Sequence, residues 1–112
     1  MTSRVLRQVR MSKKIKQEFT VQASAMDVEL SELHDMAIMD FVHESEESLE
    51  APVFLQQPKI TSAITCNIRL SSSVLNSIEK LATKDENNSV SVPAAIYTGL
   101  IRWAKKHEFK TE

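Results

Sequence analysis

Two short stretches of the chain carry the same arrangement of polar, apolar and arginine residues. Residues 8–12 read Gln-Val-Arg-Met-Ser, and residues 67–71 read Asn-Ile-Arg-Leu-Ser. In each stretch an amide side chain precedes an arginine by two positions, which places both on one face of an extended strand. Guanidinium and amide groups form paired hydrogen bonds with planar partners such as the edges of DNA bases. The pattern therefore indicates strands that expose a row of hydrogen-bonding side chains.

The sequence lacks the groupings that catalysis and metal binding require. Cys66 is the only cysteine, and the three histidines have no metal-ligand spacing. No glycine-rich phosphate loop is present, nor a set of nucleophile, acid and base. We therefore expect a protein that is not an enzyme and that holds no metal and no cofactor.

Hydropathy gives no sign of a membrane or secretory segment. No apolar run approaches the roughly 18 residues of a membrane helix, and the basic N-terminal segment is not followed by an apolar stretch. A single cysteine cannot form an internal disulfide. These features predict a protein without a membrane segment in a reducing cytoplasm.

Charge is distributed unevenly along the chain. The 14 basic and 15 acidic residues give a net charge of -1, which by itself disfavours binding to nucleic acid. Residues 1–16, however, carry six basic residues and no acidic one, whereas acidic residues crowd between positions 27 and 50. The distribution indicates one face that meets an anion and another that does not.

Apolar residues recur every four positions after each stretch, and each such trio forms one stripe of a helix. The trios are Ile15, Phe19 and Ala23 in the first half and Val74, Ile78 and Ala82 in the second. They predict helices over about 13–26 and 72–84.

Each half is expected to contain another helix after a turn. The two later helices match if this turn is three residues longer in the second half than in the first. The matched apolar pairs are then Leu30 with Val92, Leu33 with Ala95, Ala37 with Gly99, Ile38 with Leu100 and Phe41 with Trp103. They predict helices over about 28–43 and 92–106. Ser91 is the expected N-cap of the later helix, with Pro93 in its first turn, and Asp27 is the expected N-cap of the earlier one.

The segment between the halves has no helical period. It begins acidic and contains Pro52 and Pro58, which is typical of a linker. We expect a first unit over 1–44, a linker over 45–62 and a second unit over 63–112, with both units in one compact domain.

Several other side chains are expected to be structural. Part of 53–55 is expected to lie on the core, and the tail from Phe109 is expected to be frayed. Met11, Met26, Met36 and Met39 are expected to fill the core, which Phe41 and Trp103 close.

Residues about 4–44 and 63–107 each read as strand, serine-capped helix, turn and helix, which resembles the ribbon-helix-helix superfamily of the Arc, MetJ and CopG repressors. Residues 67–70 resemble the Asn-Leu-Arg-Trp strand of Arc, and residues 91–97 resemble the start of its second helix. Two units in one chain are similar to TraY-type proteins of plasmid conjugation and VirC-type proteins of T-DNA transfer. The glycine usual between the helices is missing, and so are the charged second-helix residues that pair in Arc.

The resemblance implies a mainly α fold with a short antiparallel two-stranded β-ribbon, in which tandem units form a single-chain pseudo-dimer. A lone short strand is unstable, so one strand from each unit would pair. Because side chains alternate, the helix-facing residues would be Val9, Met11, Cys66, Ile68 and Leu70. The outward row would be Leu6, Gln8, Arg10, Thr65, Asn67 and Arg69.

In this family the ribbon enters the major groove of double-stranded DNA. The resemblance thus implies base contacts from Gln8, Arg10, Thr65, Asn67 and Arg69. A phosphate would bind at the N-terminus of the second helix, assisted in the later unit by Asn88, Ser89 and Ser91. In the earlier unit Asp27 and Glu29 would repel it, and basic residues would compensate: Arg4, Arg7, Lys13, Lys14 and Lys16. The competing interpretation is that these arginines and lysines are simply solvated.

These observations favour a sequence-specific DNA-binding protein, either a transcriptional regulator or a DNA-transfer accessory protein encoded by a bacterium, plasmid or phage. The alternative is a protein-interaction module, such as an antitoxin or adaptor, that holds a partner through the acidic segment 44–62. The units could also pair between chains and form a dimer or higher assembly. A linker of about 18 residues favours pairing within one chain.

Overall fold

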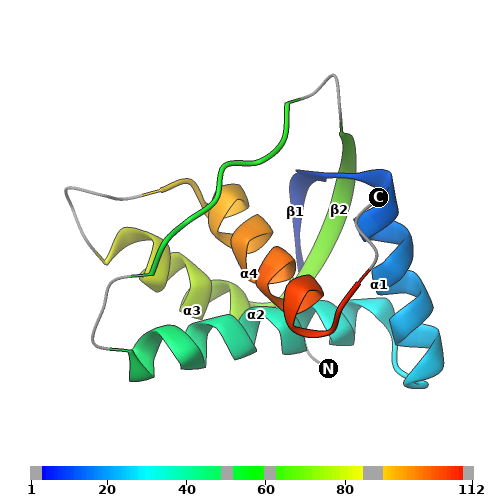
Figure 1. Cartoon of the computed structure of the whole chain (residues 1–112). Coiled ribbons are helices and arrows are strands. Elements are labelled where there is room, and N and C mark those ends of the chain that lie inside the picture. Colours follow the sequence, from blue (N-terminus) through cyan, green and yellow to red (C-terminus); the bar gives the residue numbers. More distant parts are fainter. Residues whose placement is uncertain (1–3, 49–51, 60–62, 85–89, 110–112) are drawn as a thin grey trace.

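The fold is a strand followed by two helices, and this order occurs twice in the described residues (Figure 1). The computed structural model describes residues 4–48, 52–59, 63–84 and 90–109. The first half contains β1 (Arg4–Met11), α1 (Lys13–Ala25) and α2 (Leu30–Glu47), and the second contains β2 (Ile64–Ser71), α3 (Ser72–Thr83) and α4 (Val92–Lys106). The prediction of a mainly α fold with a short antiparallel ribbon is therefore confirmed.

The two strands form an antiparallel ribbon whose register is centred on the matched stretches. Gln8 lies directly opposite Asn67, the residue that occupies the same place in the second stretch. On either side of this pair, Leu6 lies opposite Arg69 and Arg10 lies opposite Thr65. A two-fold axis relating the strands would consequently pass between Gln8 and Asn67.

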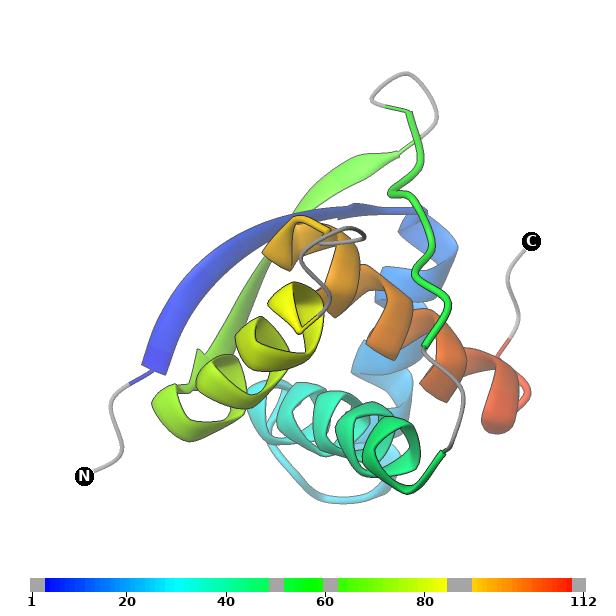
Figure 2. The same ribbon diagram turned by 90° about the vertical axis from the view of Figure 1, so that its left-hand side faces the viewer.

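One face of the ribbon is buried against the helices, as the alternation predicts. All five residues expected to face the helices are at most 3% exposed: Val9, Met11, Cys66, Ile68 and Leu70. Figure 2 shows the ribbon passing over the helices, which gather on one side of it. The opposite face carries the other parity of side chains.

The halves interlock rather than fold side by side. β1 packs mainly on α4 and β2 mainly on α2, and α2 and α4 pack against each other. Gly99 permits this close crossing, because a Cβ built there would lie 2.8 Å from Ile38 Cδ1 and 3.3 Å from Phe41 Cδ2. The two helix stripes predicted after the strands are buried as well.

The turn between α1 and α2 corrects one prediction. Asp27 is not the N-cap of α2, because Glu29 occupies that position without a side-chain capping bond. Asp27 instead has a positive φ of 57°, and the N–H groups of Asp27 and Val28 donate to Ser24 O (3.1 Å) and Ala23 O (3.0 Å). This is a Schellman ending of α1, with aspartate where glycine is usual.

The corresponding turn of the second half contains an equivalent bond. Val90 N–H donates to Ala82 O over 3.1 Å, and these residues match Val28 and Ala23 in the sequence comparison. The three extra residues of the second half therefore lie between Ala82 and Val90, as expected.

Other predictions about the ends and the core were wrong. Met26 and Met36 are 40% and 41% exposed rather than core filler. α2 continues to Glu47 and takes residues 45–47 out of the expected linker. Phe109 is not frayed, because its ring lies 5.0 Å edge-on from the Phe19 ring; residues 110–112 lie outside the described residues.

Candidate nucleic-acid interface

The outer face of the ribbon brings together the side chains expected to face outward. Gln8, Thr65, Asn67 and Arg69 are exposed, and Arg10 is half-buried. Leu6 is 43% exposed on the same face. Opposed side chains on one face of a ribbon lie about 5 Å apart, so the six form a continuous patch of arginine, amide, hydroxyl and one aliphatic group.

Arg10 is less exposed than its counterpart Arg69. Its backbone N–H, on the open edge of β1, donates to Gln57 Oε1 over 2.7 Å. Its Nε is buried and has no hydrogen-bond partner among the described residues. An unpaired buried donor costs stability, roughly 1–3 kcal/mol, so folding alone gives no reason for this placement.

Arg4 has an internal role in the structure. Its Nη1 lies 3.1 Å from Asp35 Oδ2 and donates to Arg69 O over 3.1 Å. The other carboxylate oxygen of Asp35 accepts the Ser71 N–H at 3.1 Å. Asp35 of α2 thus joins both strands at this end of the ribbon, and Arg4 is not a freely available cation. No sequence pattern singled out Asp35 for this role.

The remaining basic candidates lie near the ribbon but differ in setting. Arg7 has the parity of the helix-facing residues, and its Nη1 donates to Leu6 O over 3.0 Å. Lys14 Nζ lies 3.9 Å from Glu18 Oε1, and Lys13 and Lys16 are exposed at the start of α1.

The second half has no cations at the corresponding place. The residues that match the three lysines are Ser72, Ser73 and Leu75. Basic charge therefore gathers at the end of the ribbon where β1 leads into α1.

The N-termini of the two second helices are chemically different. Ser91 caps α4 as expected, with Oγ accepting the Ala94 N–H at 3.3 Å, and Pro93 is in the first turn. α2 begins with Glu29 at the N-cap and Glu32 in the first turn. An anion would be attracted to the N-terminus of α4 and repelled from that of α2. Asn88 and Ser89 lie outside the described residues.

The linker follows the surface of its own chain. Leu55 N–H donates to Thr98 Oγ1 of α4 over 2.7 Å, and the Phe54 ring lies 5.9 Å edge-on from the Phe41 ring. Val53, by contrast, is 75% exposed. With Gln57 bound to β1, the described part of 44–62 is engaged internally, which weighs against a segment free to hold a partner.

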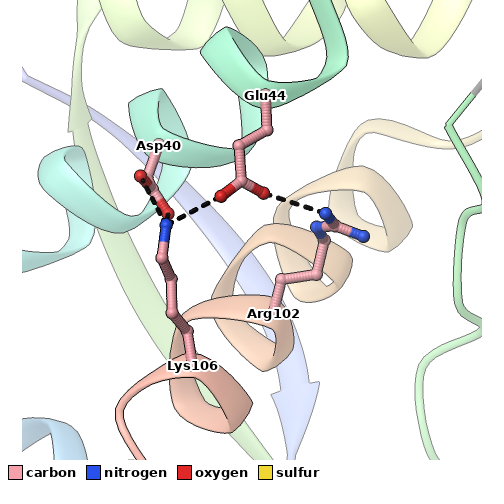
Figure 3. A network of polar contacts seen from close by, with 4 residues as sticks. All are labelled: Asp40, Glu44, Arg102 and Lys106. Carbon is pink, nitrogen blue, oxygen red and sulfur yellow. Dashed lines mark hydrogen bonds and ion pairs between the residues drawn. The ribbon is translucent and has the colours of Figure 1, made fainter. Parts of the chain in front are cut away.

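A network of ion pairs joins α2 to α4 (Figure 3). Glu44 Oε2 lies 2.9 Å from Arg102 Nη2, and Lys106 Nζ lies 2.7 Å from Glu44 Oε1 and 3.1 Å from Asp40 Oδ2. Hydrogen bonds from Lys106 and Arg102 lower the pKa of the Glu44 carboxyl, and those to Glu44 and Asp40 raise the pKa of Lys106.

This network was not predicted from the sequence. The sequence held the signal, because matching the second helices sets Asp40 against Arg102 and Glu44 against Lys106.

Two titratable groups, His34 and Cys66, lie in the buried core. Burial lowers the pKa of His34 to about 4 and raises the pKa of the Cys66 thiol. Within the described ranges, no three His, Cys, Asp or Glu side chains gather as metal ligands. In the same ranges no helix is both long and apolar enough to cross a membrane.

Comparison with known proteins adds no relative. No family model matches the chain, and no curated protein or solved structure matches it either. The interpretation therefore depends on the geometry and chemistry described above.

Proposed function

We propose that the chain is a tandem ribbon-helix-helix protein, folded as a single-chain pseudo-dimer, that binds double-stranded DNA sequence-specifically through the outer face of its ribbon. One observation carries the proposal: an exposed row of arginine and amide side chains on a two-stranded ribbon whose register is centred on the matched residues Gln8 and Asn67. The interlocked helices beneath give this face a rigid support.

The chemistry of the row suits the major groove. The groove is about 12 Å wide and admits a two-stranded ribbon. Arg10 and Arg69 could grip guanine O6 and N7, and Gln8 and Asn67 could grip adenine N6 and N7, each good pair contributing about 1–3 kcal/mol of discrimination. Thr65 would contact the thymine methyl group or a polar base edge.

Phosphate contacts would be unequal in the two halves. We assign one to the N-terminus of α4, where Ser91 lies, because the N-terminus of α2 is acidic. The exposed Lys13 and the neighbouring Lys14 would supply the contact near α1. The preferred DNA site should then be an imperfect palindrome or a non-symmetric element.

In this proposal the protein acts in the cytoplasm as a transcriptional regulator or a DNA-transfer accessory protein. It would bind DNA as a monomeric pseudo-dimer or as a higher assembly of such units, without a cofactor and without catalysis.

Selection from a random duplex pool, followed by fluorescence anisotropy at several salt concentrations, tests the proposal. Arg69→Ala should weaken binding to the selected duplex about fivefold or more, since an arginine–guanine pair contributes roughly 1–3 kcal/mol. Lys80→Ala is the matched control, because Lys80 is an exposed cation on α3 away from the ribbon. Binding that is insensitive to salt, or equal effects of the two substitutions, would refute the ribbon as the reading surface.

A further inference from the structure

The two helices that cross at the centre of the molecule carry opposite charges at matched positions. Asp40 of α2 matches Arg102 of α4, and Glu44 matches Lys106. The contacts run crosswise, between Glu44 and Arg102 and between Asp40 and Lys106, with a further contact from Glu44 to Lys106 (Figure 3). In each matched pair the two halves thus carry opposite charges, and these charges attract where α2 and α4 cross.

We propose that this arrangement selects pairing between unlike halves: the face of α2 bearing Asp40 and Glu44 fits the basic α4 of this chain, or of a second copy, and rejects another α2. The proposal does not depend on DNA binding, because it concerns only how the two halves recognise each other.

The apolar contacts at the crossing supply only part of this selectivity, through Gly99, where a Cβ would lie 2.8 Å from Ile38 Cδ1. The matched positions around it hold apolar or small residues in both helices: Ala37 and Gly99, Ile38 and Leu100, Phe41 and Trp103. Two copies of either half would therefore bring apolar surfaces of the same kind together. In a pair of like halves, however, the crossing would gather four carboxylates or four cations.

The size of the effect follows from the exposure of the network. The four side chains are 32% to 50% exposed, so water screens them and each ion contact changes an equilibrium by only about 1.8-fold. Reversing one side removes three such contacts and replaces them with repulsions of similar size. Together these changes correspond to roughly 30-fold in the folding equilibrium.

A set of full-length variants tests the coupling by urea unfolding. Asp40→Lys with Glu44→Lys makes both helices basic, and Arg102→Glu with Lys106→Glu makes both acidic. Each double variant should lose roughly 30-fold in folding equilibrium, whereas the quadruple variant, with all four charges reversed, should return to within about threefold of the parent.

Matched controls change the same charges outside the network. Glu46→Lys with Glu47→Lys alters the exposed end of α2, and Lys84→Glu with Lys105→Glu alters exposed sites on the second half. Each control should change the folding equilibrium less than about threefold. Double variants no weaker than their controls, or a quadruple variant as weak as both double variants combined, would overturn the proposal.

Mixing the two double variants tests selection itself. A chain with two basic helices and a chain with two acidic helices can satisfy both crossings only by exchanging halves. Restored attraction favours the exchanged dimer by roughly 30-fold at each of its two crossings. Together these gains exceed the advantage that the linker gives to pairing within one chain, where the effective concentration of the other half is in the millimolar range. Refolding both together at about 0.1 mM should give a heterodimer of twice the 12.7 kDa chain mass in sedimentation. Mixed controls should remain monomers. If the double variants are weakened but do not associate, the network stabilises the crossing without selecting the partner, and the proposal fails.

Discussion

Acid should destabilise this protein through one histidine in its core. His34 is 5% exposed, and its ring lies 5.4 Å from the Phe19 ring. Burial lowers its pKa to about 4, against the opposing effect of the Asp35 carboxylate and with a smaller contribution from Arg4. The matched residue in the second half is Ile96, fully buried, so this position is built for an uncharged side chain.

The magnitude follows from proton linkage. In the unfolded chain His34 takes up a proton below pH 6.5, whereas in the folded protein it does so only at about pH 4. Between these values the unfolded state binds the extra proton, so the free energy of unfolding falls as the pH falls. The contribution is fully present above pH 6.5 and is lost by about pH 4. At 1.36 kcal/mol for each pH unit, the loss is about 3 kcal/mol.

Urea unfolding of the parent and of His34→Ile between pH 7.5 and 4.5 measures this contribution. Isoleucine reproduces the side chain of the matched position and cannot titrate. The difference in unfolding free energy between the two proteins should be constant near neutral pH and should change by about 2–3 kcal/mol on acidification. Glu44, whose pKa is lowered, acts at more acidic pH in both proteins and cancels in the difference.

A control separates protonation from general loss of core packing. Ile78→Val removes one buried methyl group and should cost about 1 kcal/mol at every pH. The reasoning is refuted if His34→Ile keeps the pH dependence of the parent, or if Ile78→Val alters that dependence as much as His34→Ile does.

Three further predictions concern the backbone and the helix crossing. Asp27→Gly and Glu108→Gly should each raise stability by about 0.5–1 kcal/mol, because both residues have positive φ, 57° and 56°; a lower Tm for either variant would contradict this. Gly99→Val should cost about 2–3 kcal/mol in urea unfolding, since a Cβ there lies 2.8 Å from Ile38 Cδ1, and unchanged stability would show that α4 can move away from α2. Thr98→Val leaves the linker N–H that donates to Thr98 Oγ1 without its acceptor; faster proteolysis within 52–59 is expected, and an unchanged rate would show that this bond does not hold the linker.

Much of the fold could be predicted because the chain repeats itself. One alternating stretch of five residues is weak evidence for a strand, but the second stretch gave the same alternation followed by the same helical stripe. Matching the two halves also located the three extra residues before Val90. The hydrogen bond from Val90 N–H to Ala82 O, equivalent to that from Val28 to Ala23, agrees with this position.

The failures arose where one residue type serves two local structures. Aspartate is common at helix N-caps and also tolerates positive φ, so the sequence around Asp27 is compatible with either. The packing of α2 decides between these two structures, because it places Val28 where its N–H donates to Ala23 O at the end of α1. Similarly, nothing local to Arg4 indicates that Asp35, 31 positions away, would take its guanidinium group.

The pattern of agreement between the halves bears on function. Matched positions that are buried in both halves hold apolar or small residues, because they pack in the core. The exception is His34, which matches Ile96. Among polar positions, Asp40 and Glu44 are matched in the second half by residues of opposite charge. Exposed residues on a surface with no ligand are free to diverge, since most such substitutions change stability by less than about 0.5 kcal/mol.

The centre of the ribbon keeps the same polar chemistry in both halves. Gln8 and Asn67 both carry an amide, and Arg10 and Arg69 both carry a guanidinium group. At Arg10 this agreement leaves a buried donor without a partner in the described part of the chain. A ligand with nearly two-fold symmetry would require the same side-chain chemistry on both strands around a common axis. Duplex DNA is such a ligand. Under the proposed function, Leu6 and Thr65, which differ, would lie where the two halves of the bound DNA differ.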